Sequence, residues 1–172
     1  MKKTILILAF PLICCNHKPA HYASRHGVAE EDGQELTAMI LAREKAMISK
    51  SLVPVMAQFS EDATWINSQG YLFDGKPAIE KFHKMMFNND SLDYLYVAGD
   101  PRVRLLDHQN ALAYYGWEMI WINRADRQDT VKREIGLMTL TAQKVDTTWL
   151  WKAVTNQYTP WFYGKLDAVF IE

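Results

Sequence analysis

The sequence predicts one α+β domain, in which N-terminal helices pack on a strongly curved antiparallel sheet. Apolar residues recur at helical spacing over residues 35–48 and 78–87. Five stretches after residue 90 instead have the composition of strands joined by short polar turns. Strands joined this tightly run antiparallel, and helices that precede them cover one face of the sheet. A chain of 172 residues, 49% of them hydrophobic, is long enough to form one core.

Three helices are expected. Residues 35–48 carry an apolar face, and Ser51 can cap a shorter helix over residues 52–59. The third helix follows Asp74-Gly75-Lys76-Pro77 and covers residues 78–87, with His83 expected on its surface. Strands are expected over residues 64–67, 71–73, 92–97, 102–106, 111–122, 131–143 and 149–158.

The strand over residues 111–122 is apolar on both faces. One face carries Tyr115, Trp117, Met119 and Trp121, and the other carries Leu112, Tyr114, Gly116, Ile120 and Ile122. A solvated face would alternate with polar residues, so we expect one face to cover the interior and the other to meet a second subunit. A homodimer is therefore expected; the alternative is that residues 159–172 fold over the second face.

The N-terminal residues are typical of an exported bacterial protein. Two lysines precede an apolar run that covers about 15 Å, which is too short for a membrane span but suits a signal peptide over residues 1–14. The run ends in Leu12-Ile13-Cys14-Cys15, which resembles a bacterial lipobox, so we expect cleavage before Cys15 and its lipidation. The protein would then be anchored in the cell envelope, on the periplasmic or outer-membrane side; plain secretion and an uncleaved chain are the alternatives. Residues 15–33 are expected to form a flexible tether, and residues 34–172 the domain.

Charge and motifs exclude several classes of function. The formal net charge is -1, and no run of basic residues offers a surface for phosphates, so nucleic acid is not an expected partner. The sequence contains no Ser-His-Asp arrangement, zinc-ligand spacing or glycine-rich phosphate loop. Neither a metal nor another cofactor is therefore expected.

Two segments resemble the SnoaL-like domains of the nuclear transport factor 2-like superfamily. The first is Phe59-Ser60-Glu61-Asp62-Ala63-Thr64-Trp65, followed by Asp74-Gly75-Lys76-Pro77-Ala78-Ile79 and Phe82. The second is the final predicted strand from Trp149 to Thr159. The resemblance covers residues 35–159. It implies a cystatin-like cone, in which a bent sheet wraps around a helix and leaves a pocket in its mouth, commonly as a dimer.

The superfamily includes ketosteroid isomerases, but their residues are not matched here. These enzymes use a carboxylate base, with a tyrosine and a protonated aspartic acid that stabilise the enolate. Aligned without gaps on residues 42–67, they place Asn67 at the base and Arg43 at the tyrosine. An amide cannot accept a proton at neutral pH, and residues 137–143 contain no Asp or Glu. The isomerase mechanism is therefore disfavoured.

Two glutamates in the predicted strands are the candidate catalytic residues. Glu134 shares a face with Gly136, and Glu118 lies among aromatic residues. A carboxyl group buried in such surroundings has a raised pKa and can act as an acid or a base. The alternatives are an ion pair of Glu134 with Lys132, Arg133 or a cross-strand cation, and a place for Glu118 in a dimer interface.

We expect the pocket to suit a small apolar or aromatic ligand, because its predicted lining is apolar with a few amide and hydroxyl groups. The lining is expected to comprise Trp65, Asn67, Tyr71, Phe82, Met86, Trp117, Met119 and Asn156. The alternative is that these side chains simply fill the cone. Binding without chemistry is the first hypothesis; an enzyme of isomerase, dehydratase or hydrolase type and a dimeric protein-interaction module are the others.

Overall fold

The computed structural model describes the backbone of residues 22–159 and the side chains of residues 30–159. The helices are α1 (Tyr22–Ile48), α2 (Leu52–Met56) and α3 (Lys76–Phe87). The strands are β1 (Phe59–Ile66), β2 (Leu72–Asp74), β3 (Leu92–Ala98), β4 (Arg102–Leu105), β5 (Asn110–Asn123), β6 (Thr130–Val145) and β7 (Thr148–Tyr158). The predicted signal peptide, Cys15 and the segment after Thr159 lie outside the described residues.

The strands form a single curved sheet in the order β2-β1-β7-β6-β5-β3, and β4 pairs with the part of β5 that β3 leaves free. The predicted α+β class is confirmed. All neighbouring strands run antiparallel except β1 and β7, which are parallel. β1 and β7 can be parallel because no hairpin joins them and the rest of the chain connects them, whereas the tightly joined strands after residue 90 are antiparallel as expected.

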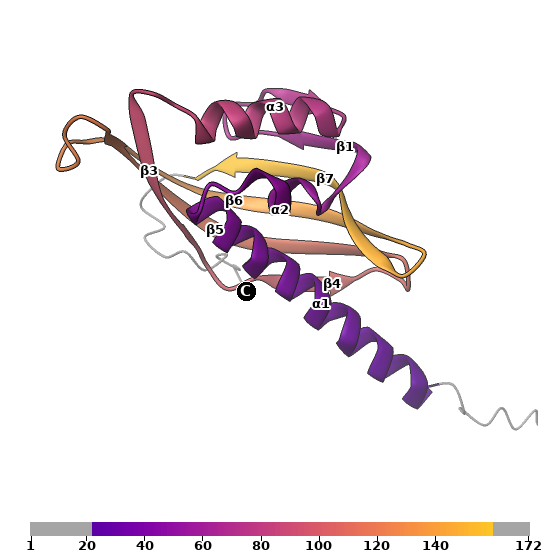
Figure 1. The fold of residues 1–172 in the computed structure, drawn as a ribbon. Helices are drawn as coiled ribbons and strands as arrows, with labels where there is room; N and C mark the ends of the chain where they lie inside the picture. The colour runs from indigo at the N-terminus through magenta and orange to yellow at the C-terminus, as the bar shows by residue number, and fades with distance from the viewer. Residues whose placement is uncertain (1–21, 160–172) are drawn as a thin grey trace, which may run out of the picture.

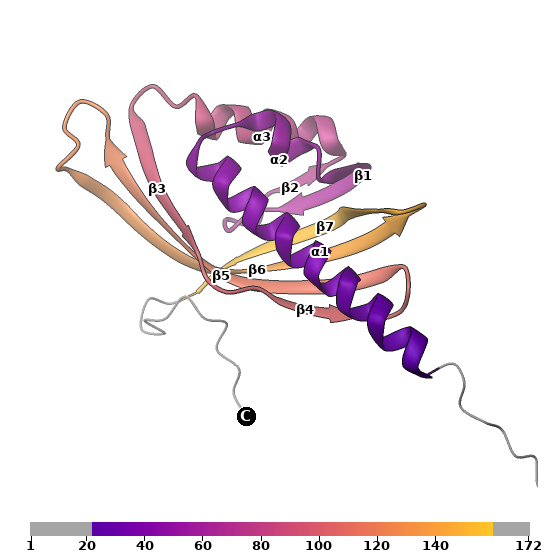
Figure 2. The same cartoon turned by 60° about the horizontal axis from the view of Figure 1, so that its bottom comes forward.

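The helices lie on one side of the sheet, as Figures 1 and 2 show. α1 runs across β3 and β4, while α3 packs on β1 and β2. Leu36 and Ile40 on the inner side of α1 are 0% and 1% exposed, and they belong to one core with Trp149 and Trp151 of β7. Burial of these large side chains, each contributing about 1.5–3 kcal/mol, holds the helix against the sheet.

α1 begins earlier than the sequence predicts. The chain is helical from Tyr22, so the structure replaces the predicted tether with helix over residues 22–33. Asp32 explains part of this extension: its side chain is buried and accepts hydrogen bonds from Trp149 Nε1 (3.0 Å) and Lys144 Nζ (2.5 Å). This contact depends on a polar residue, and the search for an apolar period therefore missed it.

The two faces of β5 separate as predicted. Tyr115, Trp117 and Met119 point to the interior and are 1–7% exposed. Ile120 lies on the opposite face. Its partner in register on β3 is Leu95, which is 53% exposed. The outer face thus combines apolar residues of two strands, and the homodimer remains a prediction.

Candidate functional site

A cavity of about 250 Å³ lies between the inner face of the sheet and the helices α1 and α3. Arg43 and Met47 of α1 contribute one wall, and Phe82, His83 and Met86 of α3 contribute another. The floor comes from the inward-facing residues of the sheet. Alternation along each strand decides which residues reach the cavity, because a strand presents every second side chain to one face.

Seven of the eight predicted ligand-binding residues line this cavity: Trp65, Asn67, Phe82, Met86, Trp117, Met119 and Asn156. Tyr71 is not among the lining residues, and it is 65% exposed. It follows the turn at Gly70, whose φ of 85° is a left-handed conformation, and its side chain leaves the interior there. The Asn67 carboxamide oxygen accepts hydrogen bonds from the backbone N–H groups of Gln69 and Tyr71 and stabilises this turn.

The two candidate glutamates lie on opposite faces of the sheet. Glu134 is paired in register with Met119 and lines the cavity, whereas Glu118 is paired with Ile135 and faces outward. Glu134 is 8% exposed and accepts hydrogen bonds from Trp121 Nε1 (2.7 Å) and Lys132 Nζ (2.6 Å). Glu118 forms an ion pair with the exposed Arg133. The structure therefore brings only Glu134 to the cavity.

Arg43 lines the cavity but was not among the ligand-binding residues predicted from the sequence, where it appeared only at the position of the isomerase tyrosine. Its side chain is 1% exposed, and its Nη1 donates a hydrogen bond to the Tyr115 hydroxyl at 2.9 Å. The guanidinium lies 5.1 Å from the centre of the Trp65 ring. No Asp or Glu among residues 30–159 forms an ion pair with it. Burial by itself would lower the pKa of Arg43, but the hydroxyls of Tyr115 and Tyr96 raise that pKa, so the group stays charged.

His83 is a second buried group, and its predicted place on the helix surface is wrong. It is 0% exposed, and its ring packs edge-on against Trp65 at 5.1 Å. Nδ1 lies 2.9 Å from the Ile79 carbonyl oxygen, which places the ring proton on Nδ1 and a free lone pair on Nε2. Burial, and then the charge of Arg43, lower the pKa of His83 to about 3, so the imidazole is neutral at physiological pH.

Both missed residues leave a signal in the sequence. Arg43 falls on the apolar stripe of α1, three residues after Ile40, and His83 falls between Ile79 and Phe87 on the apolar stripe of α3. A polar residue at such a position is buried by the helix geometry, whatever its chemistry. The position in the period therefore predicts burial better than the residue type.

Unpaired polar atoms concentrate in the cavity. Within the described part of the chain, six buried side-chain nitrogen or oxygen atoms have no hydrogen-bond partner: Arg43 Nε, Trp65 Nε1, His83 Nε2, Tyr96 Oη, Trp117 Nε1 and Asn156 Oδ1. All six belong to residues that line the cavity. Buried polar groups are normally paired, and each unpaired one costs about 1–3 kcal/mol. Their common location therefore calls for a functional explanation.

Gly136 makes room for the Trp117 indole. The two residues are paired in register, and a Cβ added at Gly136 would lie 2.4 Å from Trp117 Cε2 and Cζ2. Only glycine permits this contact, because real Cβ atoms do not approach so closely. The ring lies against β6, its residue lines the cavity, and its N–H has no hydrogen-bond partner.

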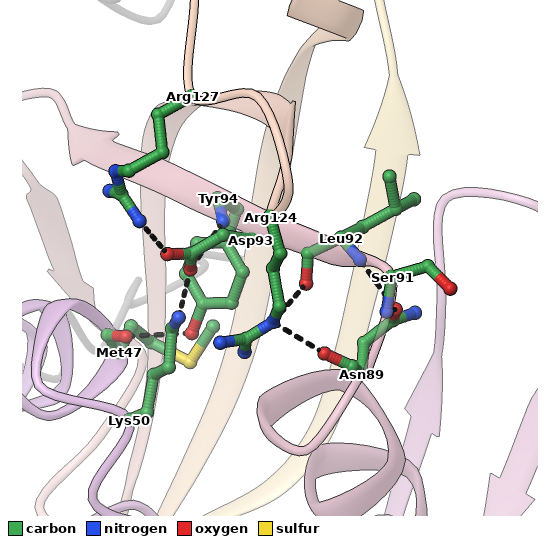
Figure 3. A network of polar contacts seen from close by, with 9 residues as sticks. All are labelled: Met47, Lys50, Asn89, Ser91, Leu92, Asp93, Tyr94, Arg124 and Arg127. Atoms are coloured by element: carbon green, nitrogen blue, oxygen red, sulfur yellow. Dashed lines mark hydrogen bonds and ion pairs between the residues drawn. The ribbon is translucent and has the colours of Figure 1, made fainter. Parts of the chain in front are cut away.

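A set of polar contacts, here named the rim network, ties the segment beside the cavity to the β5–β6 hairpin. Figure 3 shows its members: Asp93 accepts hydrogen bonds from Lys50 and from Arg127 Nη1 (2.9 Å). Arg124 Nε donates to the carbonyl oxygens of Asn89 (2.7 Å) and Leu92 (3.2 Å). Because Asn89 also lines the cavity, the network stabilises the position of one edge of the site.

The described residues hold no group of three or more His, Cys, Asp or Glu side chains that could bind a metal ion. The cavity can instead offer donors, acceptors and a cation to an organic molecule. No helix in the same part of the chain is long and apolar enough to cross a membrane.

Comparison with known proteins places the fold. No protein-family model and no curated protein matches the sequence. Similar solved structures include a nuclear transport factor 2-like superfamily protein from Salmonella enterica serovar Typhimurium, with a TM-score of 0.65 and 16% identity over 77% of this chain and 94% of that one. A ketosteroid isomerase-like protein from Erwinia carotovora atroseptica has a TM-score of 0.62 and 16% identity, over 76% and 98% of the two chains.

A third similar structure is a protein with a cystatin-like fold from Caulobacter vibrioides, with a TM-score of 0.63 and 20% identity over 75% of this chain and 91% of that one. Likeness at these identities shows the fold alone. The protein has a cystatin-like fold, and the resemblance inferred from its sequence is confirmed at that level.

Proposed function

We propose that this domain binds a small organic molecule in the cavity between α1, α3 and the sheet. One observation supports the proposal above all others: every unpaired buried polar atom of the described residues belongs to a residue that lines this cavity. A ligand with complementary groups would pair these atoms and remove a cost of about 1–3 kcal/mol for each. The aromatic and methionine side chains around them would contact the apolar part of the ligand.

The size of the cavity limits the ligand. A cavity of about 150 Å³ holds a benzene molecule, and this one is about 250 Å³. It therefore suits one aromatic ring with a short substituent, in agreement with the small apolar or aromatic ligand expected from the sequence.

Native mass spectrometry of the protein, purified from its own host without denaturation, tests the proposal. The expected result is an adduct of a few hundred daltons at most, which a denaturing spectrum of the same sample no longer shows. The denaturing spectrum is the control for covalent modification. A protein without an adduct, which also binds no small aromatic compound in a thermal-shift screen, would contradict the proposal.

A second candidate function is enzymatic proton transfer by Glu134. It is favoured by the position of this carboxylate, the only one among the lining residues, with Trp121 and Lys132 as donors that fix its orientation. A carboxylate held in this way can act as a general base. Glu134→Gln should then abolish turnover, while Glu118→Gln, on the outer face, should leave it intact. Equal rates in both variants would remove this assignment.

We also propose the export, lipid anchor and homodimer expected from the sequence. The anchor is supported by the lipobox-like residues before Cys15, and Cys15→Ala should abolish incorporation of labelled fatty acid. The dimer is supported by the exposed Leu95 and Val97 beside Ile120 on the outer face. The native mass reports the number of subunits, and a monomer would contradict the dimer.

A further inference from the structure

We infer that the ligand is an organic anion, namely a carboxylate on a single aromatic ring, and that its carboxylate binds Arg43. This inference rests on the proposed function and adds the chemical class of the ligand. It is carried by a buried cation that lacks a counter-charge and by the excess of donors in the cavity.

The charge of Arg43 is not balanced by the protein. The side chain is 1% exposed, and its Nη1 donates a hydrogen bond to the neutral Tyr115 hydroxyl, which in turn donates to the Met138 sulfur at 2.9 Å. His83, which also lines the cavity, is kept neutral by burial and by the charge of Arg43. Glu134 is engaged by Lys132 and Trp121. A buried charge without a partner is strongly unfavourable, and an incoming anion removes this cost.

The unpaired donors among the lining residues favour acceptor oxygens on the ligand. Arg43 Nε and the indole nitrogens of Trp65 and Trp117 can only donate hydrogen bonds, and all three lack partners. The Tyr96 hydroxyl can donate a fourth. A carboxylate accepts about four hydrogen bonds and carries the charge that Arg43 requires. A carboxylate therefore both balances the charge of Arg43 and accepts hydrogen bonds from the unpaired donors.

The remaining walls favour a flat apolar ring. The Phe82 ring and the side chains of Met86 and Met119 also line the cavity. Aromatic and thioether groups bind aromatic faces and edges well. With about 250 Å³ available, the ring carries its carboxylate directly or through one or two carbon atoms.

Matched pairs of compounds test this inference on the full chain. Benzoate and phenylacetate carry the charge, whereas benzamide and phenylacetamide have nearly the same shape without it. Calorimetric titration should show that the wild type binds each carboxylate at least ten times more tightly than its amide. Arg43→Gln should abolish this preference and still bind the amides, and Arg43→Lys should retain part of it.

Arg133→Gln is the matched control, because this arginine lies on the outer face, 59% exposed in its side chain and paired with Glu118. It should keep the wild-type preference. Equal affinity of the wild type for acids and amides would overturn the inference and leave the proposed function standing. A preference for acids that survives in Arg43→Gln would also overturn it. Failure of all four compounds to bind overturns the inference, while a retained adduct in the native mass would still support the proposed function.

Discussion

The cavity and the rim network differ in whether their buried charges have a counter-charge. Asp93 of the rim network accepts hydrogen bonds from Lys50, Arg127 and the Tyr94 N–H, so two cations balance its negative charge. Arg43 of the cavity is buried at least as deeply, but it donates a hydrogen bond to a neutral hydroxyl and forms no ion pair with an Asp or Glu of the described residues. Burial alone therefore does not distinguish the two regions; the presence of a counter-charge does.

This difference distinguishes polar groups that stabilise the fold from polar groups that can bind a ligand. The paired charges join segments that are distant in sequence: Asp93 joins the end of α1 to β3 and the β5–β6 hairpin, and Asp32 joins α1 to β6 and β7. The unpaired polar atoms belong instead to residues that line the cavity. Proteins commonly break the rule of paired burial at functional sites.

The largest expected effect is a loss of stability on mild acidification. This loss should come from His83 of the cavity and not from the rim network. His83 has a pKa of about 3 in the folded protein against 6.5 as its ordinary value, so the unfolded chain takes up the proton first. The free energy of unfolding should fall as pH drops below 6.5, by roughly 2–3 kcal/mol at about pH 4.5. Urea unfolding above pH 6.5 and at about pH 4.5 measures this loss.

The rim network should not contribute in that window. The pKa of Asp93 is lowered, chiefly by the hydrogen bond from Lys50, so its stabilising effect is present above its ordinary value of 3.8 and is lost only below it. His83→Phe keeps a flat ring among the aromatic neighbours and removes the titration. An unchanged pH dependence in this variant would show that another group causes the loss.

A methyl group at Gly136 is expected to have the next largest effect. Gly136→Ala forces the Trp117 ring away from β6, at a cost of about 1–3 kcal/mol in unfolding free energy, and moves it into the cavity. Ligand occupancy in the native mass should fall. Gly33→Ala is the matched control: no heavy atom lies within 4 Å of its added Cβ, and alanine at this helical position should stabilise by about 1 kcal/mol. Full occupancy in Gly136→Ala would contradict the role of the glycine.

Removal of one charge from each region tests the comparison directly. Asp93→Leu should lower the free energy of unfolding by about 1–2 kcal/mol, since Lys50 and Arg127 lose their acceptor but can turn to solvent. Arg43→Met should leave stability unchanged or raise it by up to about 1 kcal/mol, because it removes an unbalanced charge. Chemical denaturation of the ligand-free proteins measures both. If Arg43→Met proves the more damaging change, the cavity arginine has a structural role.

Much of the fold was predictable because its signals are local. The predicted strands over residues 92–97, 102–106, 111–122, 131–143 and 149–158 agree with β3 to β7 to within two residues at each end. Alternation along β5 separated its two faces, while only the structure decided which of them is inward; most of the expected pocket residues reach the cavity. Tyr71 was misplaced because a single left-handed turn at Gly70 decides where its side chain points.

The sequence by itself determined the order of helices and strands, the stripes that face the core and the aromatic and methionine walls, because these follow from periods of 3.6 and 2 along one segment. Only the tertiary structure decided that Arg43 stays without a counter-charge, that His83 is buried and neutral, that Glu134 rather than Glu118 reaches the cavity, and that Asp32 extends α1. Each of these depends on which group another segment brings alongside; Arg43 and Tyr115, for example, are 72 residues apart. The period of apolar residues along one segment predicts which side chains are buried. Their hydrogen-bond and ion-pair partners depend on contacts between segments that are distant in sequence.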